Sequence, residues 1–361
     1  MLNGHEEAVK EKRLLISLYD GCQYRCGFCM YGYVKETQPL SKKDSMSEQH
    51  WFEVLAAARA RGFGVLEIGG RGEPTLNPAF IRVAAKAFEL GYKIELLSNA
   101  LNDRSIIEIL PFIQKLTVNL NALDEKSMAR IHVPYPGFTF ERSAALVKNV
   151  IRAVAVKNLN IDLRTNYVMT RHSLKEAFSF PQQLNRMLSD GLRADRHFHV
   201  SYQHVHDYIK TPQYLGFDFE ELKKVLLLAQ LSSRNEYLLQ WTNLTDFIKQ
   251  TQQLLERLKP LSSKPVTDTD QCPRSTQYTC AVHKQVLFID GNGDCYGCYN
   301  PFRAVNGLPV DRDPFYFGNL LLQSFEGIDR DREGFEPVMD VSKAYWRPCL
   351  LCKAAEVPVK V

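Results

Sequence analysis

The stretch GCQYRCGFC, residues 21–29, holds three of the nine cysteines of this 361-residue chain. Cys22, Cys26 and Cys29 have the spacing C-x3-C-x2-C. Three thiolates on one short loop can bind three irons of a four-iron, four-sulfur cluster and leave the fourth iron open to a small molecule. A structural zinc site usually gains its fourth Cys or His close by, and the next residues, MYGYVKETQPL, contain neither. A partial zinc knuckle is the alternative interpretation.

A second motif follows in GVLEIGGRGEPTLNP, residues 64–78. An apolar strand pattern there runs into a glycine-rich turn with Gly70, Gly72, Glu73 and Pro74. Glycine lets the backbone approach a ligand closely, and the carboxylate of Glu73 can accept a hydrogen bond from an ammonium group. The alternative is an ordinary strand-to-helix turn with a solvated glutamate.

Together the two motifs resemble the signature of the radical S-adenosylmethionine (SAM) enzymes. The resemblance implies that the open iron chelates the amino and carboxylate groups of SAM, and that the turn after the second strand takes up the SAM amino group. Phe28, directly before the third cysteine, matches the family pattern, whereas Arg71 departs from it. The implied cofactors are one [4Fe–4S] cluster that binds SAM, and SAM itself.

Alternation of apolar runs with helical patterns predicts the architecture up to residue 204. The expected strands cover residues 13–19, 64–69, 92–98, 115–121, 159–169 and 198–205. One intervening helix is expected to open at Ser45, with Glu48 completing a capping box. Six such units predict an α/β fold with a parallel sheet and outer helices. The resemblance implies the same fold, a partial (β/α)6 TIM-like barrel.

Active sites of such barrels lie at the carboxyl ends of the strands, which nominates further residues. Ser98 and Asn99 end the third strand and resemble the family's Ser/Thr-Asn-Gly turn near the SAM ribose, with Ala100 in place of glycine. Two pairs share a strand face because they are two residues apart: Asn119 with Asn121, and Arg164 with Asn166.

Among these candidates, Arg164 suits the SAM carboxylate. His204 and His206, at the end of the sixth strand, are candidate substrate contacts. For each of these residues the alternative is a polar side chain satisfied by neighbours or water.

We divide the chain into the barrel (1–204), a helical connector (205–268) and a small C-terminal domain (269–361). The last segment holds the other six cysteines: Cys272, Cys280, Cys295, Cys298, Cys349 and Cys352. Its stretch FIDGNGDCYGC, with Gly293 followed by Cys298, resembles the SPASM and Twitch extensions of radical SAM enzymes.

The Twitch resemblance implies one auxiliary [4Fe–4S] cluster held by Cys280, Cys298, Cys349 and Cys352. Cys272 is an alternative ligand. A single cluster is expected because no cysteine follows Cys352. A zinc ribbon remains the competing interpretation, since Cys295 with Cys298 and Cys349 with Cys352 form two C-x2-C pairs.

The resemblance also implies the chemistry. An external one-electron reductant such as flavodoxin or ferredoxin supplies an electron, SAM is cleaved, and a 5′-deoxyadenosyl radical removes a hydrogen atom from the substrate. An auxiliary cluster can then accept an electron, which gives an oxidation. If Cys272 or Cys295 faced the substrate radical, it could instead return a hydrogen atom and give an epimerisation.

Substrate identity is less specified. Only 21 residues precede Cys22, so we expect neither a cobalamin-binding nor a peptide-recognition domain before the barrel. This favours a small molecule, such as a sugar or aminocyclitol in natural-product biosynthesis. The alternatives are a maturase that cross-links or epimerises a ribosomal peptide, and a non-catalytic iron–sulfur or zinc protein.

Composition excludes several classes. A net charge of +4, from 45 basic and 41 acidic residues, is too small to indicate a nucleic-acid partner. Nothing resembles a signal peptide or a membrane span of roughly 20 apolar residues. Nine cysteines without a secretion signal favour metal binding over disulfides, so we expect a cytoplasmic enzyme.

Overall fold

The structure is a computed structural model. It describes residues 11–19, 21–24, 26, 28–29, 46–132, 139–170, 173–188, 198–204, 219–262, 277–280, 282–298, 313, 315–336, 338–340 and 355–358. Several residues nominated above lie outside these ranges: Ser45, His206, Cys272, Cys349 and Cys352.

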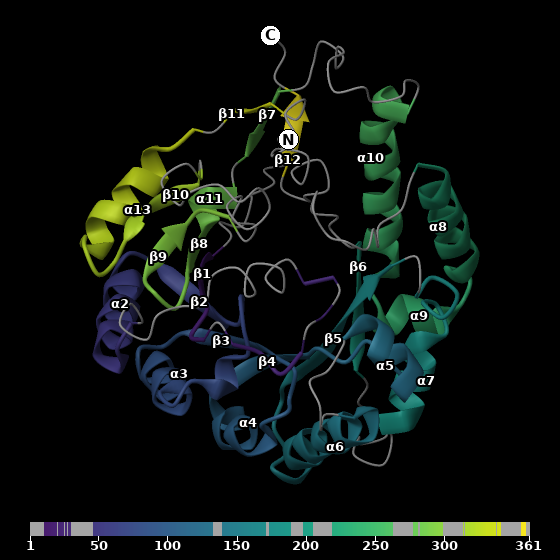
Figure 1. The fold of residues 1–361 in the computed structure, drawn as a ribbon, viewed down its shortest axis with the longest axis horizontal. Coiled ribbons are helices and arrows are strands. Elements are labelled where there is room, and N and C mark those ends of the chain that lie inside the picture. The colour runs from purple at the N-terminus through teal and green to yellow at the C-terminus, as the bar shows by residue number, and fades with distance from the viewer. Residues whose placement is uncertain are drawn as a thin grey trace, which may run out of the picture.

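Six parallel strands form a curved sheet in the order of the chain, as predicted (Figure 1). They are β1 (Lys12–Ile16), β2 (Phe63–Ile68), β3 (Lys93–Ser98), β4 (Ile113–Val118), β5 (Asp162–Met169) and β6 (His199–His204). Parallel neighbours need a crossover connection, and helices provide it on the outer side of the sheet. These are α2 (Glu48–Ala60), α3 (Phe80–Glu89), α4 (Asp103–Ile109), α5 (Glu125–Ile131), α6 (Phe140–Val156) and α7 (Phe180–Leu188), with short 3-10 turns η2 (Pro74–Leu76) and η3 (Leu110–Phe112).

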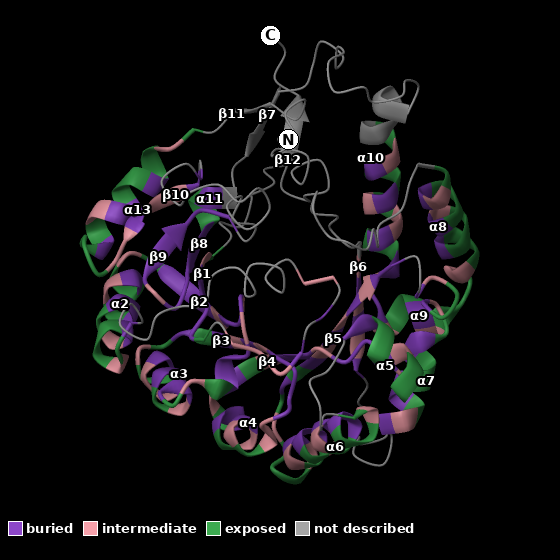
Figure 2. Cartoon of the chain, in the orientation of Figure 1, coloured by how far each residue is buried: buried purple, intermediate pink, exposed green. Residues whose placement is uncertain are grey.

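The main hydrophobic core lies between the sheet and these helices, whose buried sides face the strands (Figure 2). Helix α6 illustrates the cause, because its buried residues recur at helical spacing: Ser143, Ala144, Val147, Val150, Ile151 and Val154. In β5 burial alternates residue by residue, so one face packs on the helices and the other faces the barrel interior.

Helix α2 begins later than its sequence indicated. Ser47 is the N-cap, and its hydroxyl accepts a hydrogen bond from the backbone N–H of His50 at 3.2 Å. The His50 ring in turn accepts from the Ser47 backbone, which completes the capping box. The pairing expected between Ser45 and Glu48 is therefore replaced by one between Ser47 and His50.

The C-terminal segment joins the barrel sheet. Beyond β1 the sheet continues through β8 (Val286–Ile289), β9 (Asp294–Tyr296) and β10 (Tyr316–Asn319), with β8 parallel to β1 and the other two antiparallel. Part of the segment expected to form a separate domain is thus tied to the barrel by main-chain hydrogen bonds. A separate antiparallel sheet contains β11 (Val338–Asp340), β7 (Gln277–Cys280) and β12 (Ala355–Pro358).

The expected helical connector contains three helices, α8 (Phe219–Ser232), α9 (Glu236–Trp241) and α10 (Leu244–Ser262), of which α8 packs against α10. Two more helices flank the added strands, α11 (Val282–Gln285) and α13 (Phe325–Gly334). Of the described helices, none combines the length and apolar composition needed to cross a membrane.

A buried ion pair links the glycine-rich turn after β2 to the turn between β8 and β9. Arg71 Nη1 lies 2.6 Å from Asp290 Oδ2, and the Asp290 side chain is fully buried. The other carboxylate oxygen accepts the backbone N–H groups of Asn292 and Asp294 at 3.2 and 3.0 Å. The guanidinium also lies over the Tyr296 ring, 5.6 Å from its centroid. Arg71, which departs from the family pattern, therefore neutralises a buried carboxylate of the C-terminal segment.

Replacing Arg71 with Met should lower the free energy of unfolding by about 3–5 kcal/mol, because Asp290 is left as a buried charge without its cation. Equilibrium denaturation measures this effect, and the double variant Arg71→Met/Asp290→Asn should recover much of the loss. Arg82→Met is the matched control, because the Arg82–Glu48 pair lies on the surface and its loss should change stability little. Equal effects of Arg71→Met and Arg82→Met would contradict a structural role for the buried pair.

Candidate active site

The cysteine loop follows β1 at the carboxyl end of the strand. Cys26 is buried, Cys22 and Cys29 are half-buried, and all three pack in one cluster with Phe28 and Leu101. The Cys29 N–H donates to the Cys26 carbonyl at 2.9 Å, which closes a turn between the second and third cysteines.

A [4Fe–4S] cluster fits the chemistry of this loop, because its donors are three thiols in a largely apolar setting. Within the described ranges no three Cys, His, Asp or Glu side chains are arranged as a site for a single metal ion.

The glycine-rich turn is held against the start of the cysteine loop. Gly69 N–H donates to the Ile16 carbonyl at 3.0 Å, and Glu73 N–H donates to the Gly21 carbonyl at 2.8 Å. Gly70 has φ +109°, and a Cβ there would lie 3.1 Å from both Phe288 and Ser17. Any side chain at this position would therefore be strained and crowded. Gly72 lies between these anchored residues, and Pro74 begins η2.

The carboxylate of Glu73 is engaged inside the protein, with 2% of the residue exposed. Oε1 accepts from Thr75 N–H, Thr75 Oγ1–H and Ser98 Oγ–H at 3.2, 2.6 and 2.8 Å. Oε2 accepts the Asn99 N–H at 2.8 Å. Burial raises the pKa of Glu73, although these hydrogen bonds oppose the change. The alternative of a solvated glutamate does not hold, because this carboxylate fastens the end of β2 to the end of β3.

Ser98 and Asn99 are thereby brought beside the cysteine loop. Asn99 Nδ2 donates to Gln23 Oε1 at 2.9 Å and lies 3.8 Å from Cys22 Sγ. Ala100 has φ +58°, the left-handed conformation that favours glycine, which explains why the family pattern has glycine here.

Asn119 and Asn121 lie just beyond β4, which ends at Val118 and not at residue 121 as predicted. Their side chains still meet, because Asn121 Nδ2 donates to Asn119 Oδ1 at 3.3 Å. Asn121 is buried, and its Oδ1 accepts no hydrogen bond within the described part of the chain.

His132, which the sequence did not nominate, also belongs to this site. Its Nδ1 lies 3.2 Å from Cys26 Sγ, and the backbone N–H of Asn121 donates to its Nε2 at 3.0 Å. Over one hundred residues separate it from the cysteine loop in the chain, so no motif connected the two.

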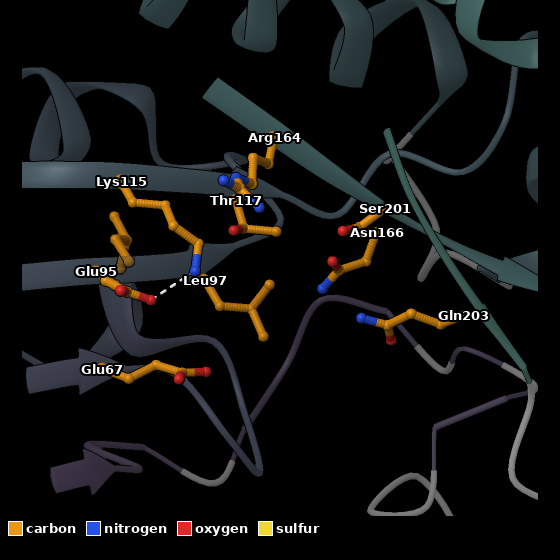
Figure 3. Close-up of a pocket in the computed structure, with 10 residues that line it drawn as sticks. Glu67, Glu95, Leu97, Lys115, Thr117, Arg164, Asn166, Ser201 and Gln203 are labelled. Carbon is orange, nitrogen blue, oxygen red and sulfur yellow. Dashed lines mark hydrogen bonds and ion pairs between the residues drawn. The ribbon is translucent and has the colours of Figure 1, made fainter. Parts of the chain in front are cut away.

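The barrel interior contains a cavity of about 190 Å³ (Figure 3). Residues from β2 to β6 line it: Glu67, Glu95, Leu96, Leu97, Lys115, Thr117, Arg164, Asn166, Ser201 and Gln203. Arg164 and Asn166 therefore face the interior. The nearest partner of Arg164 is Asp162, whose Oδ2 accepts from its Nε at 2.6 Å.

The base of this cavity is charged. Arg13 lies 2.6 Å from Glu95 and 3.3 Å from Glu67, and Lys115 lies 2.6 Å from Glu95. Burial would raise the pKa of Glu95, but hydrogen bonds from Arg13 and Lys115 outweigh it and lower the pKa. For Glu67 burial dominates over the attraction of Arg13, and its pKa is raised.

Cys295 faces away from this cavity. Leu15 pairs in register with both Glu67 and Phe288, and Phe288 pairs with Tyr296, so Tyr296 is on the cavity face of the sheet. The preceding Cys295 points to the opposite face and packs into the main core. Its side chain is fully buried, which raises the pKa of the thiol. The expectation that Cys295 returns hydrogen to a substrate radical is therefore wrong.

Other nominated residues are partly described. Cys298 is buried and follows β9 by two residues. Cys280 ends β7, and His204 ends β6.

Comparison with known proteins agrees with this geometry. Residues 16–173 match the family model described as "Radical SAM superfamily". The chain contains a radical SAM domain. That domain includes the cysteine loop, the glycine-rich turn and strands β2 to β5.

Among curated proteins, an S-adenosylmethionine-dependent nucleotide dehydratase of Lacinutrix mariniflava is 27% identical over 116 residues. The match covers 32% of this chain and only 24% of that relative.

Solved structures with a similar fold include Streptococcus suis SuiB bound to S-adenosylmethionine, with a TM-score of 0.58 and 16% sequence identity. That likeness covers 90% of this chain and 68% of SuiB. Native anSMEcpe with bound AdoMet has a TM-score of 0.57 and is 13% identical in sequence. This likeness covers 89% of this chain and 82% of anSMEcpe. At these identities the likenesses establish the fold alone.

Glu73→Gln should lower the free energy of unfolding by about 1–3 kcal/mol, because its amide group would meet a donor where the carboxylate accepts a hydrogen bond. Denaturation of the variant measures the loss, and calorimetric titration with SAM measures any effect on binding. Glu89→Gln is the matched control, since Glu89 is exposed and pairs only with Lys86 among the contacts described. Unchanged stability in Glu73→Gln would contradict the fastening role.

Proposed function

We propose that this protein is a radical SAM enzyme that acts on a small polar molecule bound in the barrel cavity and oxidises or epimerises it. A sugar or an aminocyclitol is the class of substrate we favour. The observation that carries this proposal is the cavity itself, which has charged and hydrogen-bonding side chains on five consecutive strands. An external one-electron reductant such as flavodoxin or ferredoxin would supply the electron.

Cys22, Cys26 and Cys29 would hold the cluster. When bound together, the cluster and SAM supply a 5′-deoxyadenosyl radical that removes a hydrogen atom from a substrate C–H bond. The backbone carbonyls at Gly70 and Gly72 would accept hydrogen bonds from the SAM ammonium group, while Glu73 keeps this turn against β3. In register Arg164 lies beside Thr117, one residue before the end of β4, so it is near the end of the barrel that carries the cysteine loop.

Arg164 pairs with Asp162, but about one-third of its side chain is exposed. It could therefore also bind a carboxylate of SAM or a polar group of the substrate. Asn166, Ser201 and Gln203 add neutral donors and acceptors above the charged base. Such a lining suits hydroxyl and amino groups and disfavours an apolar ligand. The partial match to a nucleotide dehydratase supports a hydroxylated small molecule.

A ribosomal peptide is the alternative substrate. One related structure is that of SuiB bound to the precursor peptide SuiA, with a TM-score of 0.56 to this chain. This likeness is one of fold.

Deuterium transfer tests the proposal directly. The reconstituted protein, SAM and dithionite are incubated with perdeuterated glucose, glucosamine or uridine, or with a deuterated peptide, and 5′-deoxyadenosine is analysed by mass spectrometry. We expect deuterium in this product with at least one of the small molecules. Cys22→Ala should abolish 5′-deoxyadenosine formation altogether, because two local thiolates cannot hold the cluster in the same way.

Deuterium transfer from the peptide alone would favour the peptide reading. Unchanged 5′-deoxyadenosine formation by Cys22→Ala would overturn the assignment of the cysteine loop.

We also propose that Cys280, Cys298, Cys349 and Cys352 hold one auxiliary [4Fe–4S] cluster that accepts the electron of the substrate radical. The packing of Cys295 in the core supports this ligand set over a zinc ribbon, because the ribbon needs Cys295 to pair with Cys298. Cys272 remains the alternative ligand and the one candidate for hydrogen return.

Replacement of Cys22, Cys26 and Cys29 together by Ala should leave about four irons per chain in one residual cluster. Mössbauer spectroscopy and metal analysis of anaerobically prepared protein measure this. Zinc in place of the residual iron would contradict the auxiliary cluster, and two residual clusters would require Cys272 and Cys295 as further ligands.

A further inference from the structure

His132 joins the cysteine loop to the end of β4. It lies directly after α5, which ends at Ile131, and is fully buried. On one side its Nδ1 is 3.2 Å from Cys26 Sγ, and on the other its Nε2 is 3.0 Å from the backbone nitrogen of Asn121.

The second contact determines which ring nitrogen carries the proton. A backbone N–H can only donate, so Nε2 of His132 must be the acceptor and carries no hydrogen. In a neutral imidazole the proton is then on Nδ1, which points at the sulfur of Cys26. The contact at 3.2 Å is therefore an N–H···S hydrogen bond from histidine to cysteine.

The surroundings keep the ring neutral and oriented. The rings of Tyr24 and Phe28 lie 5.2 and 5.8 Å from His132, centroid to centroid. Because Nε2 accepts a hydrogen bond from a backbone N–H, the ring carries one proton and is uncharged. Both nitrogens are occupied, and the aromatic neighbours limit rotation of the ring.

We propose that His132 is a positioning residue that donates a hydrogen bond to the Cys26 thiolate and so raises the reduction potential of the cluster bound there. The inference rests on the proposed function of the cysteine loop. Hydrogen bonds to cluster sulfurs tune the potential. The reduced cluster carries one more negative charge than the oxidised one, so a donor at sulfur stabilises it more. Histidine thereby makes electron entry easier.

Two variants separate the two hydrogen bonds of the ring. In His132→Gln the amide can replace Nε2 toward Asn121 and no longer reaches Cys26, whereas in His132→Asn the amide nitrogen can replace Nδ1–H. The reduction potential of the cluster is measured on reconstituted protein by a redox titration. The titration follows the electron paramagnetic resonance signal of the cluster at Cys22, Cys26 and Cys29, which is recognised because added SAM changes it. We expect the reduction equilibrium constant to fall about tenfold in His132→Gln, which is about 59 mV for one electron. His132→Asn should stay close to the wild type.

An unchanged potential in His132→Gln, or an equal fall in both variants, would overturn the inference while leaving the proposed function intact. A wild-type protein without a SAM-sensitive cluster signal would overturn both. A second measurement needs no variant. Wild-type protein labelled with ¹⁵N-histidine should show a weak coupling between the His132 nitrogen and the reduced cluster in pulsed electron paramagnetic resonance. Absence of this coupling would contradict the hydrogen bond.

Discussion

Strand β1 is the element on which the rest of the structure depends. Its five residues pair on one side with β2, and four of them pair on the other side with β8. The cysteine loop begins a few residues later, so the position of β1 sets the position of the thiols relative to the glycine-rich turn. The Glu73 carboxylate in that turn accepts hydrogen bonds from Ser98 and Asn99 and so holds the turn against the end of β3. Three strand ends are thereby held together around one site.

The interior face of the sheet has an apolar part and a polar part. On the side of β1 and β8 the cavity face is apolar, with Leu15, Phe288 and Tyr296 packed together. From β2 to β6 the same face is polar, and Glu95 of β3 pairs there with Lys115 of β4 and with Arg13, which reaches across from β1. A charged interior is costly unless its members are paired, and here each carboxylate at the base has a cation beside it. A substrate with hydroxyl or amino groups can add to such a network, whereas an apolar one cannot.

Much of the barrel could be predicted from the sequence, because strand alternation and helix periodicity are local signals. The cysteine spacing and the glycine-rich turn likewise lie within short segments. Other features depended on residues distant in the chain. The buried partner of Arg71, the contact of His132 with Cys26, and the core position of Cys295 all follow from strand pairing that no local pattern encodes. The burial of Glu73 could not be predicted for the same reason, since its partners come from β3 as well as from its own turn.

The pairing of β1 with β8 has a consequence for how the chain is made. Residues 286–289 leave the ribosome long after residues 12–16, so one edge of β1 has no partner for most of synthesis. Contacts between such distant segments form slowly, and an open strand edge with the apolar run Leu14, Leu15 and Ile16 is a site for wrong pairing with another chain. Chains that stop before β8 would keep that edge exposed, close to the loop that carries three free thiols. The second edge of β1 is therefore covered only after residues 286–289 have been made.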